Sequence, residues 1–348
     1  MISKPAKILV IRLSALGDVA MTIPVIHSIA KQHPNVEITF ISKPWVKPLF
    51  ENTGVRFIGA DIRKGRKGVI DFFRFFSMLR KMEKWDVVID LHDVIFSKFL
   101  RKLFRLYQVP VVKINKGRQE KKELTQYPKK EFKQLATTFE RYVDTLKRAG
   151  LPISVEFDTI FPTQTELTPD IVDLLGNKNA KWIGIAPFAQ HKGKVYPPEK
   201  MEEVVQHFNQ KDGVKIILFG GGKAEEAALK VWETKYDNAI SVAGKIRLGQ
   251  ELLVMDYLDV MVSMDSANMH LASLTATPVV SIWGATHPYA GFYGWKQPVD
   301  NIIQLDLSCR PCSVYGNKEC MWGDYRCMND IKPETIIRKI EEIIYSQE

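Results

Sequence analysis

Short apolar runs alternate with amphipathic stretches along the first half of the chain. Four runs rich in β-branched residues, at 7–12, 36–42, 86–91 and 109–114, are typical of strands buried on both faces of a parallel sheet. Helical periodicity occupies 18–32, 68–83, 93–104 and 131–149, and a glycine and a proline soon afterwards mark the end of the last helix. This alternation predicts a doubly wound α/β domain.

The same alternation begins again after residues 151–170, a segment rich in Thr and Pro that we interpret as a linker. Strands are expected at 182–187, 214–219, 259–264 and 278–283, and helices at 197–211, 223–236, 249–256 and 266–275. A last helix, 333–346, begins with a proline in its first turn. The chain is therefore predicted to form two Rossmann-like domains, 1–160 and 170–330, that face each other across a cleft.

The composition is that of a globular protein, because 45% of the 348 residues are hydrophobic and 26% are charged. No window approaches 18 consecutive apolar residues, and the first 30 residues lack the regions of a signal peptide. These features predict a cytoplasmic protein.

Positive charge is concentrated in one segment. Residues 98–148 hold 15 Lys or Arg against five Asp or Glu, which accounts for the net charge of +9 of the whole chain. Such a concentration favours an anionic partner, either nucleic acid, a membrane surface or a phosphorylated lipid. A solvated face without a partner is the simpler alternative.

The loop after the first predicted strand reads RLSALGD and places Asp18 directly after Gly17. Ligands of open α/β sheets bind beyond the carboxyl ends of the strands, and a glycine there permits close approach of a ligand. Asp18 is therefore either a cap of the following helix or a general base. The loop is not a dinucleotide fingerprint, because G-x-G-x-x-G is absent, and the chain has no P-loop motif.

The loop after the third strand of the second half has the same layout. Asp265 and Ser266 precede a helix of small residues, whose first amide groups, at Ala267 and Asn268, suit a diphosphate. An ordinary helix cap is the alternative. His270, within the first turns of that helix, is expected to be a packed core residue.

Two further loops carry candidates for binding a nucleotide. Lys192 or Lys194 follows the strand 182–187 and can reach a phosphate as a point charge. The glycines at 220–222 let the backbone approach a nucleotide, and Glu225 can hold a ribose. The common position of these loops, after successive strands of one domain, is stronger evidence than any one of them.

The four cysteines fall within 19 residues, at Cys309, Cys312, Cys320 and Cys327. A reducing cytoplasm argues against a disulfide framework, and the first pair has the spacing of zinc ligands. A structural zinc site is therefore one prediction, and reduced packing thiols are the other.

On these segments the chain resembles the ADP-heptose:lipopolysaccharide heptosyltransferases, glycosyltransferase family 9. The resemblance spans nearly the full length and rests on ILVIRLSALGDVAMTIPVIHSIAKQHP, KVYPPEKMEEVV, FGGGKAEEAAL and VSMDSANMHLASLTATPVVSIWGAT. It implies a GT-B fold in which the C-terminal helix packs back on the first domain. It also implies an inverting, metal-independent transfer of heptose from ADP-heptose to the lipopolysaccharide inner core, on an acceptor of Kdo–lipid A type.

The resemblance assigns roles to residues of this sequence. Asp18 matches the general base of the family. The expected donor-binding residues are Lys194 at the diphosphate, Glu225, and Asp265 near the sugar, together with Ser266, Ala267 and Asn268. The expected acceptor-binding residues are Ser14, Gly17, Lys98 and Arg101.

The chain departs from the family pattern in three loops. Hydroxyl-bearing residues often stand where this chain has Ala189 and Gln190, and Gly and Pro are usual where it has Ala267 and Ala285. These departures leave the donor nucleotide open, so a GT-B transferase for another nucleotide sugar or glycan acceptor is the first alternative.

The implied acceptor is a lipid that carries phosphates and acidic sugars. The basic segment 98–148 is therefore expected to face it from the first domain, on an enzyme held peripherally at the cytoplasmic surface of the inner membrane. No cofactor is required for the implied reaction. An RNA-binding protein is the alternative of another class, but the chain lacks RNP-like and GXXG signatures, so no nucleic-acid partner is expected. A catalytically inactive binding module is a further alternative, and the intact Asp18 counts against it.

Overall fold

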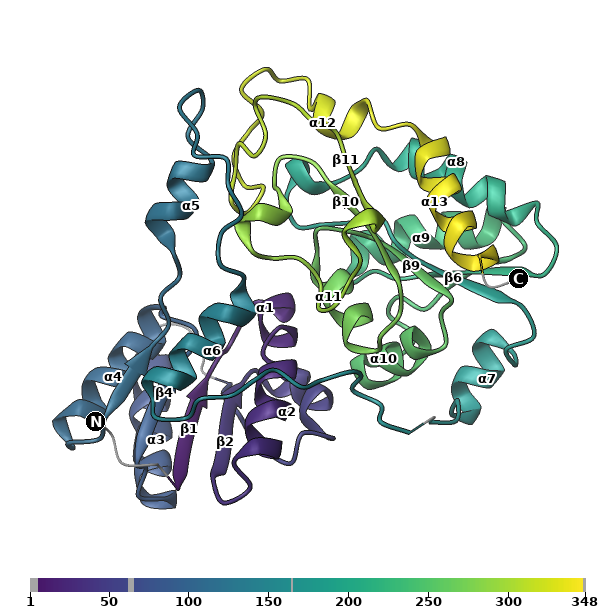
Figure 1. Ribbon diagram of the computed structural model, residues 1–348. Coiled ribbons are helices and arrows are strands. Elements are labelled where there is room, and N and C mark those ends of the chain that lie inside the picture. The colour runs from purple at the N-terminus through teal and green to yellow at the C-terminus, as the bar shows by residue number, and fades with distance from the viewer. Residues whose placement is uncertain (1–5, 62–65, 164, 347–348) are drawn as a thin grey trace. The chain divides into compact units, whose positions relative to one another are not determined.

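Five parallel strands form the sheet of the first part of the chain, in the order β3-β2-β1-β4-β5. The computed structural model describes residues 6–61, 66–163 and 165–346 (Figure 1). The strands are β1 (Lys7–Ile11), β2 (Glu37–Ser42), β3 (Arg56–Gly59), β4 (Val87–Asp90) and β5 (Val111–Lys113). The central strand β1 is buried from Ile8 to Ile11, which explains its nearly unbroken apolar run. Four of these strands were predicted, and β3 was missed because it is short and half-exposed.

The helices of this sheet follow its strands. They are α1 (Leu16–Ala20), α2 (Ile23–Gln32), the 3-10 helix η1 (Pro44–Phe50), α3 (Arg66–Met82), α4 (Ile95–Leu106) and α6 (Thr138–Arg148). The helix predicted at 18–32 is divided into α1 and α2. Thr22 lies at the division, where its hydroxyl donates to the Val19 carbonyl at 2.6 Å, and Pro24 stands in the first turn of α2.

Six parallel strands form the second sheet, in the order β11-β10-β9-β6-β7-β8. They are β6 (Lys181–Ala186), β7 (Val214–Leu218), β8 (Ala239–Ser241), β9 (Val260–Met264), β10 (Val279–Trp283) and β11 (Ile302–Gln304). The helices are α5 (Arg118–Leu124), α7 (Pro169–Leu175), α8 (Pro198–Asn209), α9 (Lys223–Lys235), α10 (Leu248–Asp256), α11 (Ala267–Leu274), α12 (Arg326–Asn329) and α13 (Pro333–Tyr345), with 3-10 helices η2 (Lys192–Lys194), η3 (Pro288–Ala290) and η4 (Val299–Asn301).

The chain divides into two units whose boundaries differ from the predicted ones. Unit 1 extends to Lys116 and resumes over Thr138–Asp158, and unit 2 comprises Gly117–Thr137 and the chain from Thr159 onward. The excursion 117–137, which includes α5, is held in unit 2 by a hydrogen bond from the Leu135 amide to the Tyr289 carbonyl at 3.0 Å. The prediction that the whole basic segment 98–148 belongs to the first domain is therefore wrong. Six of its 15 cations lie in unit 2: Arg118, Lys121, Lys122, Lys129, Lys130 and Lys133.

The C-terminal helix α13 packs within unit 2, against α8. Its Ile336, Ile340 and Ile344 are fully or nearly fully buried and belong to the core cluster of that unit. The expectation that this helix packs back on the first domain is corrected, because its apolar stripe is covered by α8 and the second sheet. Among the described residues, no helix combines the length and the hydrophobicity that crossing a membrane requires.

Gly184, in the central strand β6, provides a test of the packing of this core. A Cβ built at Gly184 would lie 2.6 Å from the Met261 Sδ atom, inside van der Waals contact. We expect Gly184→Ala to lower the free energy of unfolding by about 1–3 kcal/mol, because the core would be overpacked. Urea denaturation measures the change. Gly221→Ala is the control, since its Cβ would meet nothing within 4 Å. Equal stability of the two variants would contradict the packing described for β6.

Candidate functional site

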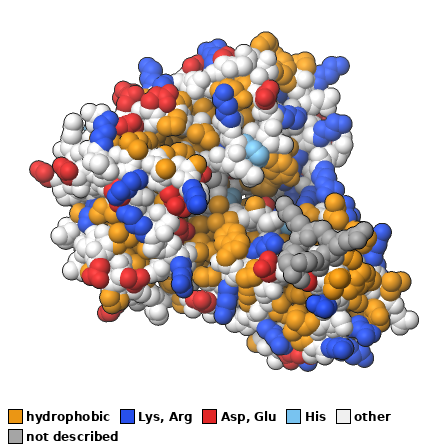
Figure 2. Space-filling view, turned by 180° about the vertical axis from the view of Figure 1, so that it is seen from behind, with side chains coloured by type: hydrophobic (Ala, Val, Ile, Leu, Met, Phe, Trp, Pro, Cys, Tyr) orange, Lys and Arg blue, Asp and Glu red, His pale blue; other side chains and the backbone are white. Residues whose placement is uncertain are grey.

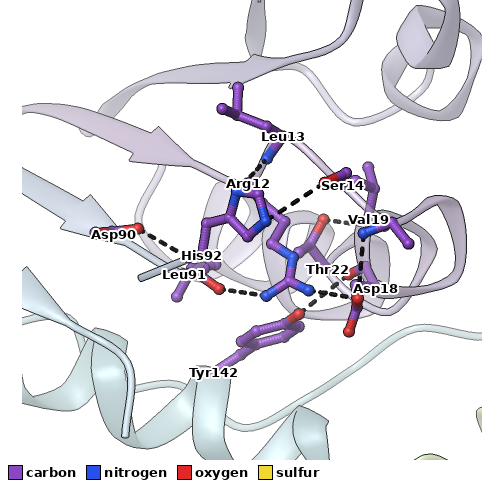
Figure 3. Close-up of polar contacts among 11 residues, drawn as sticks. Arg12, Leu13, Ser14, Asp18, Val19, Thr22, Asp90, Leu91, His92 and Tyr142 are labelled. Atoms are coloured by element: carbon purple, nitrogen blue, oxygen red, sulfur yellow. Dashed lines mark hydrogen bonds and ion pairs between the residues drawn. The ribbon is translucent and has the colours of Figure 1, made fainter. Parts of the chain in front are cut away.

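The loop after β1 holds Asp18 in a fixed position. Asp18, shown in Figure 3, is the third residue of α1. Its Oδ2 atom accepts a hydrogen bond from the Ala15 amide at 3.2 Å. The buried guanidinium of Arg12 forms an ion pair with the same oxygen at 2.5 Å, and it also donates to the Leu91 carbonyl at 2.7 Å. The carboxylate thus serves the first turn as a cap partner, while 28% of its side chain stays exposed and can meet a ligand.

His92 follows β4 and faces the same loop. Its Nδ1 atom accepts from the Leu13 amide at 3.4 Å, and its Nε2 atom lies 3.5 Å from the Ser14 hydroxyl (Figure 3). An Nδ1 that accepts a hydrogen bond carries no proton, so the neutral ring has its proton on Nε2. Burial, reinforced by the positive charges of Arg12 and Lys116, lowers the pKa of His92 to about 3. The imidazole is therefore a neutral group that orients the exposed Ser14.

Two residues expected to bind the acceptor have different environments. Lys98 is exposed on α4. Arg101 is buried, and its guanidinium pairs with Asp90 at 3.0 Å and with Asp93 at 2.8 Å. Because these two carboxylates engage its charge inside unit 1, the structure does not support the expected acceptor contact at Arg101, which stays a prediction. Gly17, the remaining residue of the acceptor set, is buried in α1.

In unit 2, two of the predicted donor residues are in direct contact. The Lys194 Nζ atom, at the end of η2, lies 3.0 Å from the Asp265 Oδ2 atom, beyond the end of β9. Asp265 is almost completely buried. The loop that carries Lys194 is fixed to the loop after β10, because the Ala285 amide donates to the Gly193 carbonyl at 2.8 Å. A Cβ at Gly193 would lie 2.8 Å from the Ala285 Cβ, so the glycine permits this close approach.

Ser266 is the N-cap residue of α11, but its side chain makes no cap hydrogen bond. Its hydroxyl lies 3.2 Å from the Ser263 hydroxyl instead. Ala267 and Asn268 occupy the first turn of the helix and are half-buried, directly after Asp265. The structure thus places the predicted anion site and the Lys194–Asp265 pair at the same edge of the second sheet. His270 is buried, as expected of a packed residue.

Glu225 lies in the first turn of α9 and turns toward the preceding glycines. Its Oε2 atom accepts from the Gly221 amide at 2.8 Å, so the carboxylate stabilises the glycine loop. Glu226, one residue further, approaches Gly244, whose added Cβ would lie 2.8 Å from the Glu226 carboxyl carbon. A ribose-binding role of Glu225 stays a prediction.

The four cysteines are free thiols, and two of them contact different acceptors. The Cys312 Sγ atom lies 3.8 Å from the Ala285 carbonyl, and the Cys320 Sγ atom lies 3.6 Å from the Asp324 carboxylate. Cys327 is buried, and burial raises its pKa to about 11, which favours a protonated thiol. In the described part of the chain no three or more His, Cys, Asp or Glu side chains are arranged to hold a metal ion. This arrangement does not support the zinc site predicted at Cys309, Cys312, Cys320 and Cys327, which stays a prediction.

Three residues of these loops were not assigned a role from the sequence. Arg12 and His92 each follow an apolar strand. A polar residue at the carboxyl end of a strand indicates a candidate site residue, and this signal could have identified both of them, as it identified Asp18. Thr286, after β10, is buried, and its Oγ1 atom has no hydrogen-bond partner. Its loop is fixed by the buried Arg310, which donates to the Thr286 carbonyl at 3.0 Å.

Comparison with known proteins places these loops in a family context. The model of a family described as glycosyltransferase family 9 (heptosyltransferase) matches residues 73–322. Lipooligosaccharide heptosyltransferase 2 of Campylobacter jejuni is 22% identical over 333 residues, which cover 94% of this chain and 96% of the relative.

Two solved structures share the fold over nearly the whole chain. The ADP-heptose lipopolysaccharide heptosyltransferase II of E. coli has a TM-score of 0.73 and 18% identity, and the match covers 98% of this chain and 99% of that one. The E. coli heptosyltransferase WaaC, solved with ADP-2-deoxy-2-fluoro heptose, has a TM-score of 0.68 and 18% identity, with 97% and 99% covered. The two parallel sheets therefore form a fold of GT-B type.

The lowered pKa of His92 predicts a pH dependence of folding stability. In the unfolded chain the imidazole binds a proton near pH 6.5, whereas in the folded protein it does so only near pH 3. Stability contributed by the neutral ring is therefore fully present above pH 6.5 and is lost as the pH falls toward 3, by about 3 kcal/mol at pH 4. We expect His92→Gln to lose less stability than the wild type between pH 7 and pH 4 in urea denaturation. An NMR titration in which the His92 ring protonates near pH 6.5 would contradict this.

Proposed function

The chain belongs to glycosyltransferase family 9, and we propose that it transfers a heptose from ADP-heptose to a sugar hydroxyl of the lipopolysaccharide inner core, with inversion at the anomeric carbon. One observation of this chain carries the proposal: Lys194 and Asp265 meet at 3.0 Å beside the first turn of α11. A cation and helix amides suit a diphosphate, and a buried carboxylate suits the hydroxyls of a sugar. One site thus offers complementary groups to both parts of a nucleotide sugar.

The acceptor hydroxyl must lose a proton as its oxygen bonds to the anomeric carbon, and we assign this proton to Asp18. Its carboxylate is partly exposed, and the Arg12 ion pair and the Ala15 amide fix its orientation. Both contacts use the Oδ2 atom, so Oδ1 is the oxygen that we assign to the acceptor proton. A positioned base of this kind contributes about 10²–10⁴-fold to a rate.

The bond from the anomeric carbon to the ADP oxygen breaks in the same step, and negative charge grows on the leaving diphosphate. We propose that Lys194 and the amides of Ala267 and Asn268 stabilise that charge. These groups supply the positive charge that a divalent cation supplies in other transferases, which supports transfer without an added metal. The reaction requires that both units bind the substrates of one transfer.

We further propose that the enzyme works peripherally at the cytoplasmic surface of the inner membrane. The relatives named above act, by their names, on lipooligosaccharide or lipopolysaccharide, whose core is anchored in lipid. Nine of the 15 cations of segment 98–148 lie in unit 1, the unit that carries Asp18. The exposed cations among them, such as Lys98, Lys102 and Arg105, attract anionic lipid headgroups without a spanning helix.

Another nucleotide sugar is the second candidate donor, and the alanines at 189, 267 and 285 favour testing it, because they alter the loops next to Lys194. ADP-heptose, UDP-sugars and GDP-sugars are offered in turn with a truncated Kdo–lipid A acceptor, and the released nucleoside diphosphate is measured. Release of ADP alone is expected. Release of UDP or GDP at a higher rate would replace the proposed donor.

The base assignment predicts the effect of Asp18→Asn. We expect kcat to fall about 10²–10⁴-fold because the amide cannot accept the acceptor proton. ADP binding, measured by calorimetry, stays within a factor of two because Asp18 does not belong to the unit that holds Lys194. Near-normal turnover of the variant would rule out Asp18 as the base.

The phosphate assignment predicts the effect of Lys194→Ala. Loss of a charge-assisted contact worth about 1.5–3 kcal/mol should raise the Kd of ADP about 10–150-fold. Lys192→Ala is the matched control, because the Lys192 Nζ atom lies over the Tyr325 ring at 4.7 Å. The Kd of ADP for this variant should equal that for the wild type. Unchanged ADP affinity in Lys194→Ala would remove this lysine from the donor site.

A further inference from the structure

Helix α4 exposes large apolar side chains to solvent. Ile95, Phe99 and Leu106 are 74%, 56% and 77% exposed, although apolar residues of this size are usually covered. Val69, Ile70 and Phe73 of α3 are also more than half exposed. Clusters of exposed apolar side chains mark interaction sites more often than single exposed residues do.

The two helices present these side chains on one surface, because they pack against each other. The Phe72 and Phe96 rings lie 5.3 Å apart, and the Arg80 guanidinium lies 4.4 Å from the Tyr107 ring centre. We call this surface the α3–α4 face and define it by the exposed side chains of Val69, Ile70, Phe73, Ile95, Phe99 and Leu106. In Figure 2, orange and blue side chains lie side by side on the lower right part of the molecule, where unit 1 is seen from behind.

The charges on this face have one dominant sign. Lys98, Lys102 and Arg105 are exposed on α4, and that helix contains no acidic residue. Exposed Arg74 and Arg80 of α3 add to them. The face therefore complements a partner that is apolar inside and anionic at its surface.

We propose that the α3–α4 face docks unit 1 on a bilayer that contains anionic phospholipid. Phe, Ile and Leu side chains between lysines and arginines are the composition of helices that lie in the membrane interface. The apolar side chains enter the acyl boundary, and the cations meet the lipid phosphates. This proposal rests on the proposed function, because docking would bring the transferase to the membrane in which its acceptor is anchored.

Co-sedimentation of the full chain with vesicles tests this. We expect binding to phosphatidylethanolamine vesicles with 30% phosphatidylglycerol and at least tenfold weaker binding to phosphatidylcholine vesicles. The double variant Phe99→Ser/Leu106→Ser should bind at least tenfold more weakly because it lacks the inserted groups. Lys102→Ala/Arg105→Ala should bind about 25-fold more weakly, at about fivefold for each cation.

The matched control removes exposed apolar side chains from unit 2. Val231 and Val299 are 63% and 70% exposed, and Val231→Ser/Val299→Ser should bind vesicles like the wild type. Wild-type protein that does not sediment with anionic vesicles would overturn the proposal. So would α3–α4 variants that bind as tightly as the wild type, or a loss of binding that the control variant shares.

A separate readout distinguishes this proposal from the proposed function. With a water-soluble, delipidated acceptor, the α3–α4 variants should keep the wild-type rate of ADP release, which also shows that they fold. Vesicle binding without any transfer would contradict the proposed function but support the α3–α4 face as a docking surface. Transfer that is unaffected both by vesicles and by the α3–α4 substitutions would support the proposed function and contradict membrane docking. The face would then be assigned to an acidic protein partner.

Discussion

Parallel strands place their carboxyl ends at one edge of a sheet, and this constraint determines where chemistry can occur in each unit. Asp18 and His92 follow the adjacent strands β1 and β4, so their loops meet although the sequence separates them widely. Lys194 follows β6 and Asp265 follows β9, which are again adjacent strands. Each unit thus brings two loops together at the end of a strand pair, and each pair of loops supplies charged groups.

A buried carboxylate, Asp90, fixes the loop after β4 and links it to the surface helix α4. The Asp90 Oδ1 atom accepts from the amides of His92 and Asp93 at 2.8 and 2.9 Å, while its Oδ2 atom pairs with Arg101 of α4. Burying such groups is costly unless each finds partners, so the arrangement has little freedom. Because Asp90 joins the loop of His92 to α4, a single ionic cluster positions both the loop beside Asp18 and the helix that carries half of the α3–α4 face.

The strand pattern could be predicted because buried parallel strands leave a continuous apolar signal, as in β1 and β9. The excursion 117–137 could not, because its charged sequence is anchored in unit 2 by few apolar residues, chiefly Leu124 and Leu135. An amphipathic stripe likewise predicts α13 but does not identify what covers it.

The site could be predicted in part, because candidate residues were recognised from their place after strands. Their pairing could not, since sequence does not give the orientation of a side chain such as Lys194 toward Asp265. The burial of Arg101 was missed although the sequence carries a signal for it. Its helical spacing places it with Ser97, Leu100 and Phe104 on the buried side of α4. Its position in a run of basic residues suggests exposure instead. Periodicity is therefore the better guide wherever a basic run is also helical.

The Lys194–Asp265 pair has a consequence for donor selection under the proposed function. Without a donor, each charge is balanced by the other at 3.0 Å, and Asp265 is almost completely buried. A diphosphate that draws Lys194 toward itself leaves that carboxylate next to added negative charge, which is unfavourable in a buried site. Sugar hydroxyls that donate to Asp265 restore its hydrogen bonds, so the sugar offsets a cost that the diphosphate creates. A nucleoside diphosphate without its sugar cannot restore the hydrogen bonds of Asp265. The Lys194–Asp265 pair therefore favours binding of the intact donor over binding of the nucleoside diphosphate. This weaker binding of the product assists its release after transfer.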